Sequence, residues 1–156
     1  MNLIRTKDDK TQIHILCKDH VPNYAMKNEF QTNAFSIKMN QLELHEEEYY
    51  GYIVDEGGAF FCVNITIKNL TNEELILSKN DFYIYYDNEG PYEPEANFEV
   101  DEQFQDNLRL EPYQKITGKF VFIISKNAKK ITFKYFEYYD DFSMKEYRLR
   151  YNIQQR

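Results

Sequence analysis

The segment Ala59-Phe-Phe-Cys-Val-Asn-Ile-Thr-Ile-Lys68 carries the clearest structural signal in the sequence. Apolar side chains stand at every second position, and Asn64, Thr66 and Lys68 occupy the opposite face. Alternation with a period of two over this length is typical of a β-strand that buries one face. We therefore predict a half-buried strand here.

Shorter alternating segments with turn signals between them extend on both sides of this strand. The predicted strands are Phe35–Leu44, Leu75–Leu77, Phe82–Tyr86, Leu108–Leu110, Ile116–Ile124, Ile131–Tyr135 and Tyr147–Ile153. In the first of them, a slip of one residue between Met39 and Leu42 indicates either two short strands or one strand with a bulge. Short strands separated by turns predict an all-β protein, an immunoglobulin-like antiparallel β-sandwich of about seven to nine strands.

The chain has 156 residues, which fits one domain at about 150 residues per domain. The N-terminal part is polar and weakly patterned, so we expect a partly ordered arm over residues 1–30 and the sandwich over residues 31–156. There are two cysteines, Cys17 and Cys62. One pair is too few for a disulfide framework, so two buried thiols are predicted, with a Cys17–Cys62 bridge as the alternative.

The formal net charge is -7, with a pI near 5.0. That field repels a phosphate backbone, so no nucleic-acid partner is expected. The basic residues Lys126, Lys129 and Lys130, and the pair Arg148 and Arg150, are interpreted as solvated charges of turns and strand faces. An acidic surface suits solubility, and it also suits a basic partner.

The N-terminal segment lacks the apolar region of a signal peptide, and no stretch approaches the roughly 18 apolar residues of a membrane span. The expected location is cytoplasmic if Met1 is the native start. The alternative is an exported or cell-surface protein from which a leader has been removed.

Two motifs resemble a recurrent bacterial pattern. Phe61-Cys-Val-Asn-Ile-Thr-Ile-Lys-Asn69, followed by Asp81-Phe82, is similar to a V-x-V-x-I-x-N strand, a turn and a D-F strand. Leu110-Glu-Pro-Tyr-Gln-Lys-Ile-Thr-Gly118-Lys-Phe-Val-Phe122 is similar to L-x-P-G-x-x-x-x-G-x-x-x-F, with Tyr113 in place of the first glycine. Together they resemble the DUF4352 / telokin-like domains and the mycobacterial immunogenic protein family.

The resemblance implies an immunoglobulin-like sandwich in which Tyr113 changes a turn but not the architecture. Members of this family are mostly exported or lipid-anchored. The family has no general catalytic residues, so the resemblance assigns none here.

The residues themselves also predict no catalytic site, metal site or cofactor. No Ser or Cys stands in an activating motif, and there is no phosphate-binding glycine loop. The three-residue spacing of His14, Cys17 and His20 places successive members on opposite faces of a strand, which disfavours a metal site. Calcium would require loops at one end of the sandwich to bring Asp87, Glu89 and Asp140 together.

Aromatic side chains are 17% of the chain, and some of them flank acidic turns. Tyrosine is enriched at protein interfaces because it buries a large area and keeps a polar end. The predicted interaction surface consists of Tyr49, Tyr50, Tyr52, Tyr138, Tyr139 and Phe142. The alternative is that these rings cap an aromatic core.

The predicted function is a non-enzymatic module that binds a protein partner, or a second copy through an edge strand. The alternatives are an accessory domain that binds a small ligand or Ca²⁺ through its acidic loops, and an acidic antagonist of a basic protein.

Overall fold

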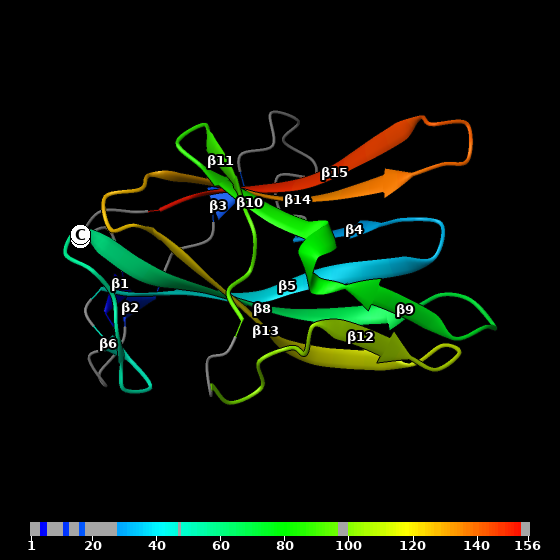
Figure 1. The fold of residues 1–156 in the computed structure, drawn as a ribbon, viewed down its shortest axis with the longest axis horizontal. Coiled ribbons are helices and arrows are strands. Elements are labelled where there is room, and N and C mark those ends of the chain that lie inside the picture. The colour runs from blue at the N-terminus through cyan, green and yellow to red at the C-terminus, as the bar shows by residue number, and fades with distance from the viewer. Residues whose placement is uncertain are drawn as a thin grey trace.

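The computed structural model describes residues 28–46, 48–96 and 100–153, together with the backbone of the pairs 4–5, 11–12 and 16–17. Two antiparallel sheets pack against each other and form a β-sandwich (Figure 1). The predicted all-β class is confirmed. Within the described residues, no helix is long and apolar enough to cross a membrane.

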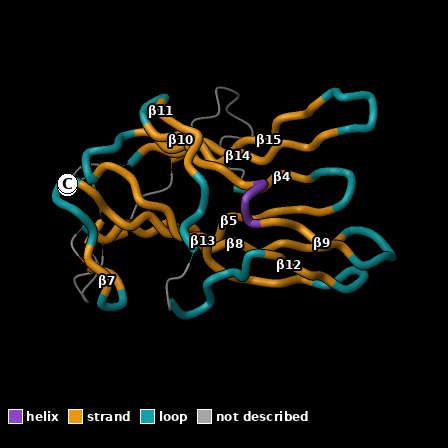
Figure 2. The backbone as a smooth tube through the Cα atoms, in the orientation of Figure 1, coloured by secondary structure: helices purple, strands orange, loops and turns teal. Residues whose placement is uncertain are grey.

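The first sheet has the order β1-β2-β5-β8-β13, with β4 also paired to β5, and the second has the order β11-β10-β14-β15-β3. Two small sheets, β12-β9 and β6-β7, accompany them. The strands are β1 (Ile4–Arg5), β2 (Thr11–Gln12), β3 (Leu16–Cys17), β4 (Glu29–Gln31), β5 (Phe35–His45), β6 (Glu48–Tyr49), β7 (Tyr52–Ile53), β8 (Gly58–Asn69), β9 (Leu75–Ser78), β10 (Phe82–Tyr86), β11 (Glu89–Tyr92), β12 (Asn107–Leu110), β13 (Lys115–Ser125), β14 (Lys130–Tyr138) and β15 (Met144–Asn152). A short 3₁₀ turn, η2 (Lys79–Asp81), joins β9 to β10 and is drawn in purple in Figure 2.

Strand β8 lies at the centre of the first sheet, as its long alternation predicts. It pairs with β13 without interruption and with β5 on its other side. The register with β5 shifts between Met39 and Gln41, so the predicted slip is a bulge within one strand. The bulge residue Asn40 donates side-chain hydrogen bonds to Asn64 Oδ1 at 3.0 Å and Thr66 Oγ1 at 2.9 Å.

The main core lies between the two large sheets and is built on aromatic rings. Phe82 of β10 contacts Phe120 of β13 at a ring-centroid distance of 5.2 Å, Phe133 of β14 at 5.9 Å and Tyr135 at 5.0 Å. Alternate residues of β5, β8, β13, β14 and β15 supply most of the other buried side chains, as their sequence period predicts. The aromatic surplus of the composition therefore fills this core in large part.

The first sheet also buries part of its outer face, which corrects the prediction that β8 is half-buried. Phe60 and Cys62 of β8 form a second apolar cluster with Val121 of β13, covered by Tyr49 and Val100. The outer face of β8 is partly exposed from Asn64 to Lys68. The sequence period misses this because the covering residues come from β6 and a distant loop.

The turn after β10 is shorter than the predicted turn over Asp87 to Pro91. Asp87 and Asn88 adopt φ of 48° and 69°, the pattern of a type I′ hairpin turn, and β11 begins at Glu89. Asx residues tolerate this left-handed conformation better than other residues with side chains. The Asp87-Asn88 dipeptide thus closes a tight hairpin.

The predicted N-terminal arm lies mostly outside the described residues. Residues Glu29–Gln31 form β4, so the predicted boundary between residues 30 and 31 falls inside a strand of the first sheet. Cys62 is a buried thiol and not half of a disulfide, which overturns the alternative of a Cys17–Cys62 bridge. The side chain of Cys17 lies outside the described residues.

Alkaline pH should destabilise the fold through Tyr135. Burial, with smaller contributions from nearby acidic groups, raises the pKa of this phenol from 10.0 to about 12. Because the folded state disfavours the phenolate, the stabilisation is complete below pH 10 and is lost as the pH rises towards 12. We expect Tyr135→Phe to lose about 2 kcal/mol less stability than the wild type over this range. Urea unfolding at several pH values measures the difference, and identical pH profiles would contradict it.

Candidate functional site

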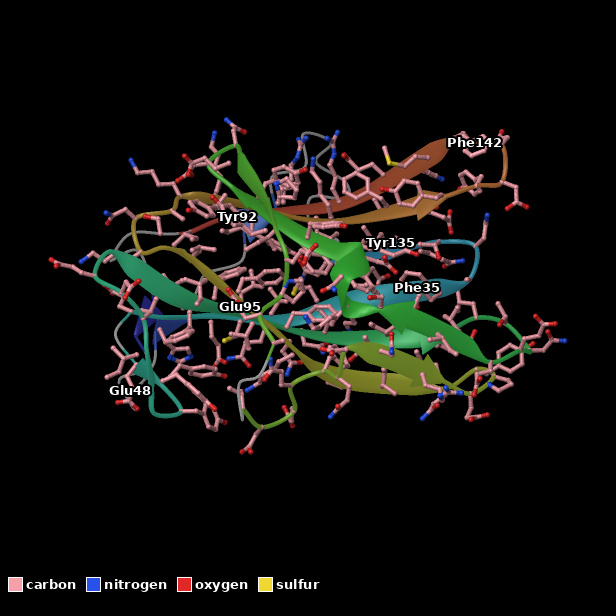
Figure 3. The ribbon with its side chains drawn as sticks, in the orientation of Figure 1. Phe35, Glu48, Tyr92, Glu95, Tyr135 and Phe142 are labelled. Carbon is pink, nitrogen blue, oxygen red and sulfur yellow. The ribbon has the colours of Figure 1, made fainter. Side chains whose placement is uncertain are left out.

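The hairpin between β14 and β15 presents Phe142, the most exposed large apolar side chain of the described residues, together with other exposed apolar side chains. Phe142 is 98% exposed and Tyr138 is 71% exposed, and Met144 at 50% lies opposite Tyr138 in the β14–β15 register. Figure 3 shows Phe142 at the far end of this hairpin, away from the core residues Phe35 and Tyr135. We call Tyr138, Tyr139, Phe142 and Met144 the aromatic tip.

Local hydrogen bonds fix the loop of the aromatic tip. The Tyr139 amide donates to Ser143 O, and the Phe142 amide donates to Tyr139 O, both at 3.0 Å. The carboxylate of Asp141 accepts from the amide and the hydroxyl of Ser143. Phe142 itself has φ of 67°, a conformation that residues with side chains rarely adopt. The loop therefore holds an exposed ring in one strained, defined backbone geometry.

Acidic groups surround the tip. Glu137 Oε1 accepts hydrogen bonds from the hydroxyls of Tyr139 at 2.6 Å and Tyr147 at 3.2 Å. The first of these bonds is the main cause that raises the pKa of Tyr139 to about 12. The hydrogen bonds from Ser143 lower the pKa of Asp141 below its ordinary value. With Asp140 beside it, the tip combines apolar rings with carboxylates.

The six residues predicted as one interaction surface lie at two separate places. Tyr49, Tyr50 and Tyr52 belong to the β6–β7 hairpin, and Figure 3 places Glu48 of that hairpin at the opposite end of the molecule from Phe142. Tyr49 is only 5% exposed and packs in the second apolar cluster. The burial of Tyr49 matches the description of a ring that caps a core. Tyr50 is 45% exposed, and Tyr52 packs partly buried against the same cluster.

The structure brings together a buried polar cluster next to Tyr49 that the sequence pattern does not predict. His45 Nε2 lies 3.8 Å from Glu43 Oε2, and the His45 ring stacks on Tyr49 at a centroid distance of 4.2 Å. Lys119 Nζ donates to the Tyr49 hydroxyl at 3.3 Å. Burial, followed by the neighbouring Cys62, raises the pKa of Tyr49 above its ordinary range. Because these groups are covered by β6, we interpret them as the polar part of the second cluster.

The acidic residues considered for calcium do not meet. Asp87 lies next to the start of β14, where its carboxylate accepts from the Lys129 and Lys130 amides, whereas Asp140 follows the end of the same strand. The condition that a calcium site would require, loops at one end of the sandwich that bring Asp87 and Asp140 together, is therefore not met. Among the residues that the structure describes, no three His, Cys, Asp or Glu side chains are placed to hold a metal ion. His14, His20 and the Cys17 side chain lie outside the described residues.

Several residues of the two sequence motifs are buried and stabilise the fold through packing or backbone hydrogen bonds. Asn69, which ends the first motif, is fully buried and bonds the backbone of two loops, and Phe82 lies at the centre of the core. Leu110 and Phe122 are also fully buried. Gly118 faces the ring of Phe104, and a Cβ there would approach within 2.5 Å of the ring. Each of these five motif positions thus has a packing or backbone role that accounts for its residue type.

Tyr113 occupies the turn position where the resembling motif has glycine. Pro112 precedes it, the Gln114 amide donates to Glu111 O at 3.0 Å, and Tyr113 has φ of 60°. This is the geometry of a type II turn, in which glycine is favoured at the third position. The turn keeps the geometry that glycine favours, contrary to the expectation that Tyr113 changes it.

Tyr113→Gly should therefore stabilise the protein. Relief of the left-handed strain is worth about 1–2 kcal/mol, and the greater flexibility of unfolded glycine costs about 0.5–1 kcal/mol. We expect a net gain of roughly 0.5–1 kcal/mol in chemical denaturation. Tyr113→Ala keeps the Cβ and should give no gain. An equal gain in both variants would show that the side chain, and not the backbone, is responsible.

Solved structures with similar folds are themselves proteins without an assigned activity. A candidate lipoprotein of Bacillus subtilis (ycdA) superposes with a TM-score of 0.61 at 15% identity over 78% of this chain, which spans 38% of that protein. A conserved hypothetical protein of Bacillus anthracis superposes with a TM-score of 0.57 at 14% identity, over 96% of this chain and 100% of that one. A functionally unknown protein of Listeria monocytogenes gives 0.57 at 12% identity, over 81% and 82%. At these identities the similarity concerns the fold alone.

No curated protein matches the sequence. A family model does, and its match covers residues 24–147, which include both motifs and every strand from β4 to β14. The chain belongs to the family described as a domain of unknown function, DUF4352.

Proposed function

We propose that this domain is a non-enzymatic interaction module that binds a protein partner through the aromatic tip of the β14–β15 hairpin. The observation that carries the proposal is the exposure of Phe142, 98%, in a loop that hydrogen bonds hold in a strained conformation. Exposed apolar clusters of this kind mark binding sites in soluble proteins. A fixed loop also loses little conformational entropy when it binds.

The chemistry of the tip indicates what kind of partner it fits. Phe142 and Tyr138 supply the anchor rings that dominate binding energy at protein interfaces. Asp140, Asp141 and Glu137 surround them, so the complementary surface is an apolar pocket with a basic rim. The same carboxylates disfavour an anionic lipid surface. An acidic antagonist of a basic protein would use this same chemistry.

The ligand-binding alternative has less support. Calcium binding through Asp87 and Asp140 would need side chains from opposite ends of β14 to meet. The buried cluster of His45, Glu43 and Tyr49 contains groups that enzymes use, but its burial in the second core favours a structural role. A non-enzymatic role therefore fits the arrangement of these groups best.

We include an exported or cell-surface location in this proposal. It is supported by the fold similarity to a candidate lipoprotein of Bacillus subtilis. Fractionation of the native cells, with the protein detected in the envelope or the medium, tests the location. Detection in the cytoplasm alone would contradict it and would leave the aromatic tip as a separate question.

Removing the tip rings should abolish binding without changing the fold. We expect the double variant Phe142→Ser and Tyr138→Ser to weaken capture of the partner at least about thirtyfold, as loss of a hot spot of 2 kcal/mol or more implies. The matched control is Ile76→Ser on β9, which removes an exposed apolar side chain elsewhere. Quantitative capture from native cell extract compares the three proteins. A partner that binds all three equally would contradict the proposal.

A further inference from the structure

The outer face of the second sheet gathers basic side chains that are scattered in the sequence. The strand register places Thr132 of β14 opposite Arg150 of β15, and Lys134 opposite Arg148. Since Phe133 between them is fully buried in the core, these two pairs project outward. Side chains opposite each other on one sheet face lie about 5 Å apart at Cβ, so the three cations are neighbours.

A hollow of about 530 Å³ opens on this face. Its basic lining consists of Lys130, Lys134, Arg148 and Arg150, and Tyr85 and Asp87 contribute from β10 and its turn. The volume lies within the range of small-molecule sites, about 300–1,000 Å³. Four cations around one hollow stand out in a chain whose formal charge is -7.

Among the described residues, the carboxylates next to this hollow are fewer than its cations. The Asp87 carboxylate accepts hydrogen bonds from the backbone amides of Lys129 and Lys130, at 3.0 Å each. Glu146 lies beside the hollow and bridges Lys134 Nζ at 3.2 Å and Arg148 Nη1 at 3.3 Å. Within the part of the chain that the structure describes, two carboxylates therefore lie beside these four cations, and Glu146 orients two of the cations.

The cation Lys134 is positioned by the aromatic ring of Tyr85. Lys134 Nζ lies 4.2 Å from the centroid of the Tyr85 ring, and the Lys134 side chain is only 18% exposed. A cation over an aromatic face in a partly covered position is attracted to the ring and loses mobility. The hollow therefore presents at least one charge whose position is fixed before a ligand arrives.

We propose that this hollow binds a small polyanion that carries two or more phosphate or carboxylate groups. Guanidinium groups such as those of Arg148 and Arg150 bond oxyanions in pairs, and both line the hollow. The overall negative charge acts weakly against this, since charges beyond about 8 Å are screened at physiological ionic strength. The site is independent of the aromatic tip, which lies at the other end of β14.

Titration calorimetry at low and physiological salt tests the site, with inorganic pyrophosphate and citrate as the two probes. We expect saturable binding of at least one probe. Tighter binding of pyrophosphate would identify phosphate as the preferred group, and tighter binding of citrate would identify carboxylate. Arg148→Gln with Arg150→Gln should weaken it at least about tenfold, the loss of one charged hydrogen bond or more. The matched control is Lys68→Gln with Lys115→Gln, an adjacent pair of exposed cations on the first sheet.

Other outcomes would overturn the proposal. Equal weakening by both double variants would mean unspecific attraction to positive charge, and no saturation with either probe at millimolar concentration would mean that the hollow is not a ligand site. A protein mass that rises with concentration and falls with salt, and that depends on Arg148 and Arg150, would mean that the acidic tip of a second copy fills the hollow. Light scattering on the same samples distinguishes that case.

Discussion

Asn69→Ala should lower the free energy of unfolding by about 3 kcal/mol or more. The Asn69 side chain is fully buried, and its Nδ2 donates to the carbonyl oxygens of Glu73, Leu110 and Glu111 at 2.7, 3.3 and 3.1 Å. Its Oδ1 accepts from the amide and the hydroxyl of Thr71 at 2.9 and 2.8 Å. One amide therefore joins the turn after β8 to the turn after β12, and its removal leaves several buried polar groups without that partner.

Two further variants make this result interpretable. Asn69→Asp keeps the shape but places a carboxylate against three carbonyl oxygens, so at neutral pH it should cost at least as much as alanine. Asn72→Ala changes an exposed residue of the same turn and should alter stability by less than about 0.5 kcal/mol. Urea denaturation measures all three. A loss below about 1 kcal/mol in Asn69→Ala would show that water replaces these bonds without cost.

Phe82→Ala should cost about 3–5 kcal/mol. The ring is fully buried and touches rings from both sheets, among them Phe35 of β5 at a centroid distance of 6.3 Å and Phe120 of β13 at 5.2 Å. Its removal takes the apolar ring out of the core and leaves a cavity that stiff aromatic neighbours fill poorly. The predicted loss is a large part of the total stability of a domain of this size.

The control for Phe82→Ala is the same substitution at the aromatic tip. Phe142 is 98% exposed, so Phe142→Ala should leave the free energy of unfolding within about 0.5 kcal/mol of the wild type. Thermal and chemical denaturation of both variants test the pair together. A loss of more than about 1 kcal/mol at Phe142 would assign the ring a role in folding and would weaken the proposal that it is kept for binding.

The long strands are predictable from sequence because their core-facing side chains, as in β13, β14 and β15, recur at every second position. The bulge at Asn40 is predictable for the same reason, since one extra residue in a strand shifts every following side chain to the opposite face. Each of these inferences uses only residues that are neighbours along the chain.

Features that depend on pairing between distant segments are not predictable in this way. The burial of Phe60 and Cys62 needs Tyr49 and Val100 to cover them, and no local period reports that contact. The separation of Tyr49 from Phe142 likewise follows from strand order, so sequence proximity to acidic turns groups residues that the fold places far apart. The basic hollow depends on the β14–β15 register in the same manner.

Site-specific photo-crosslinking tests the central claim, the binding role of the aromatic tip, most directly. A benzoylphenylalanine at position 142 should give one discrete cross-linked protein in native cells or extract, and the same group at position 76 should not give it. Excess wild-type domain should suppress this product, whereas the variant with Phe142→Ser and Tyr138→Ser should not. The absence of any product at position 142, or the same product from positions 142 and 76, would contradict the account.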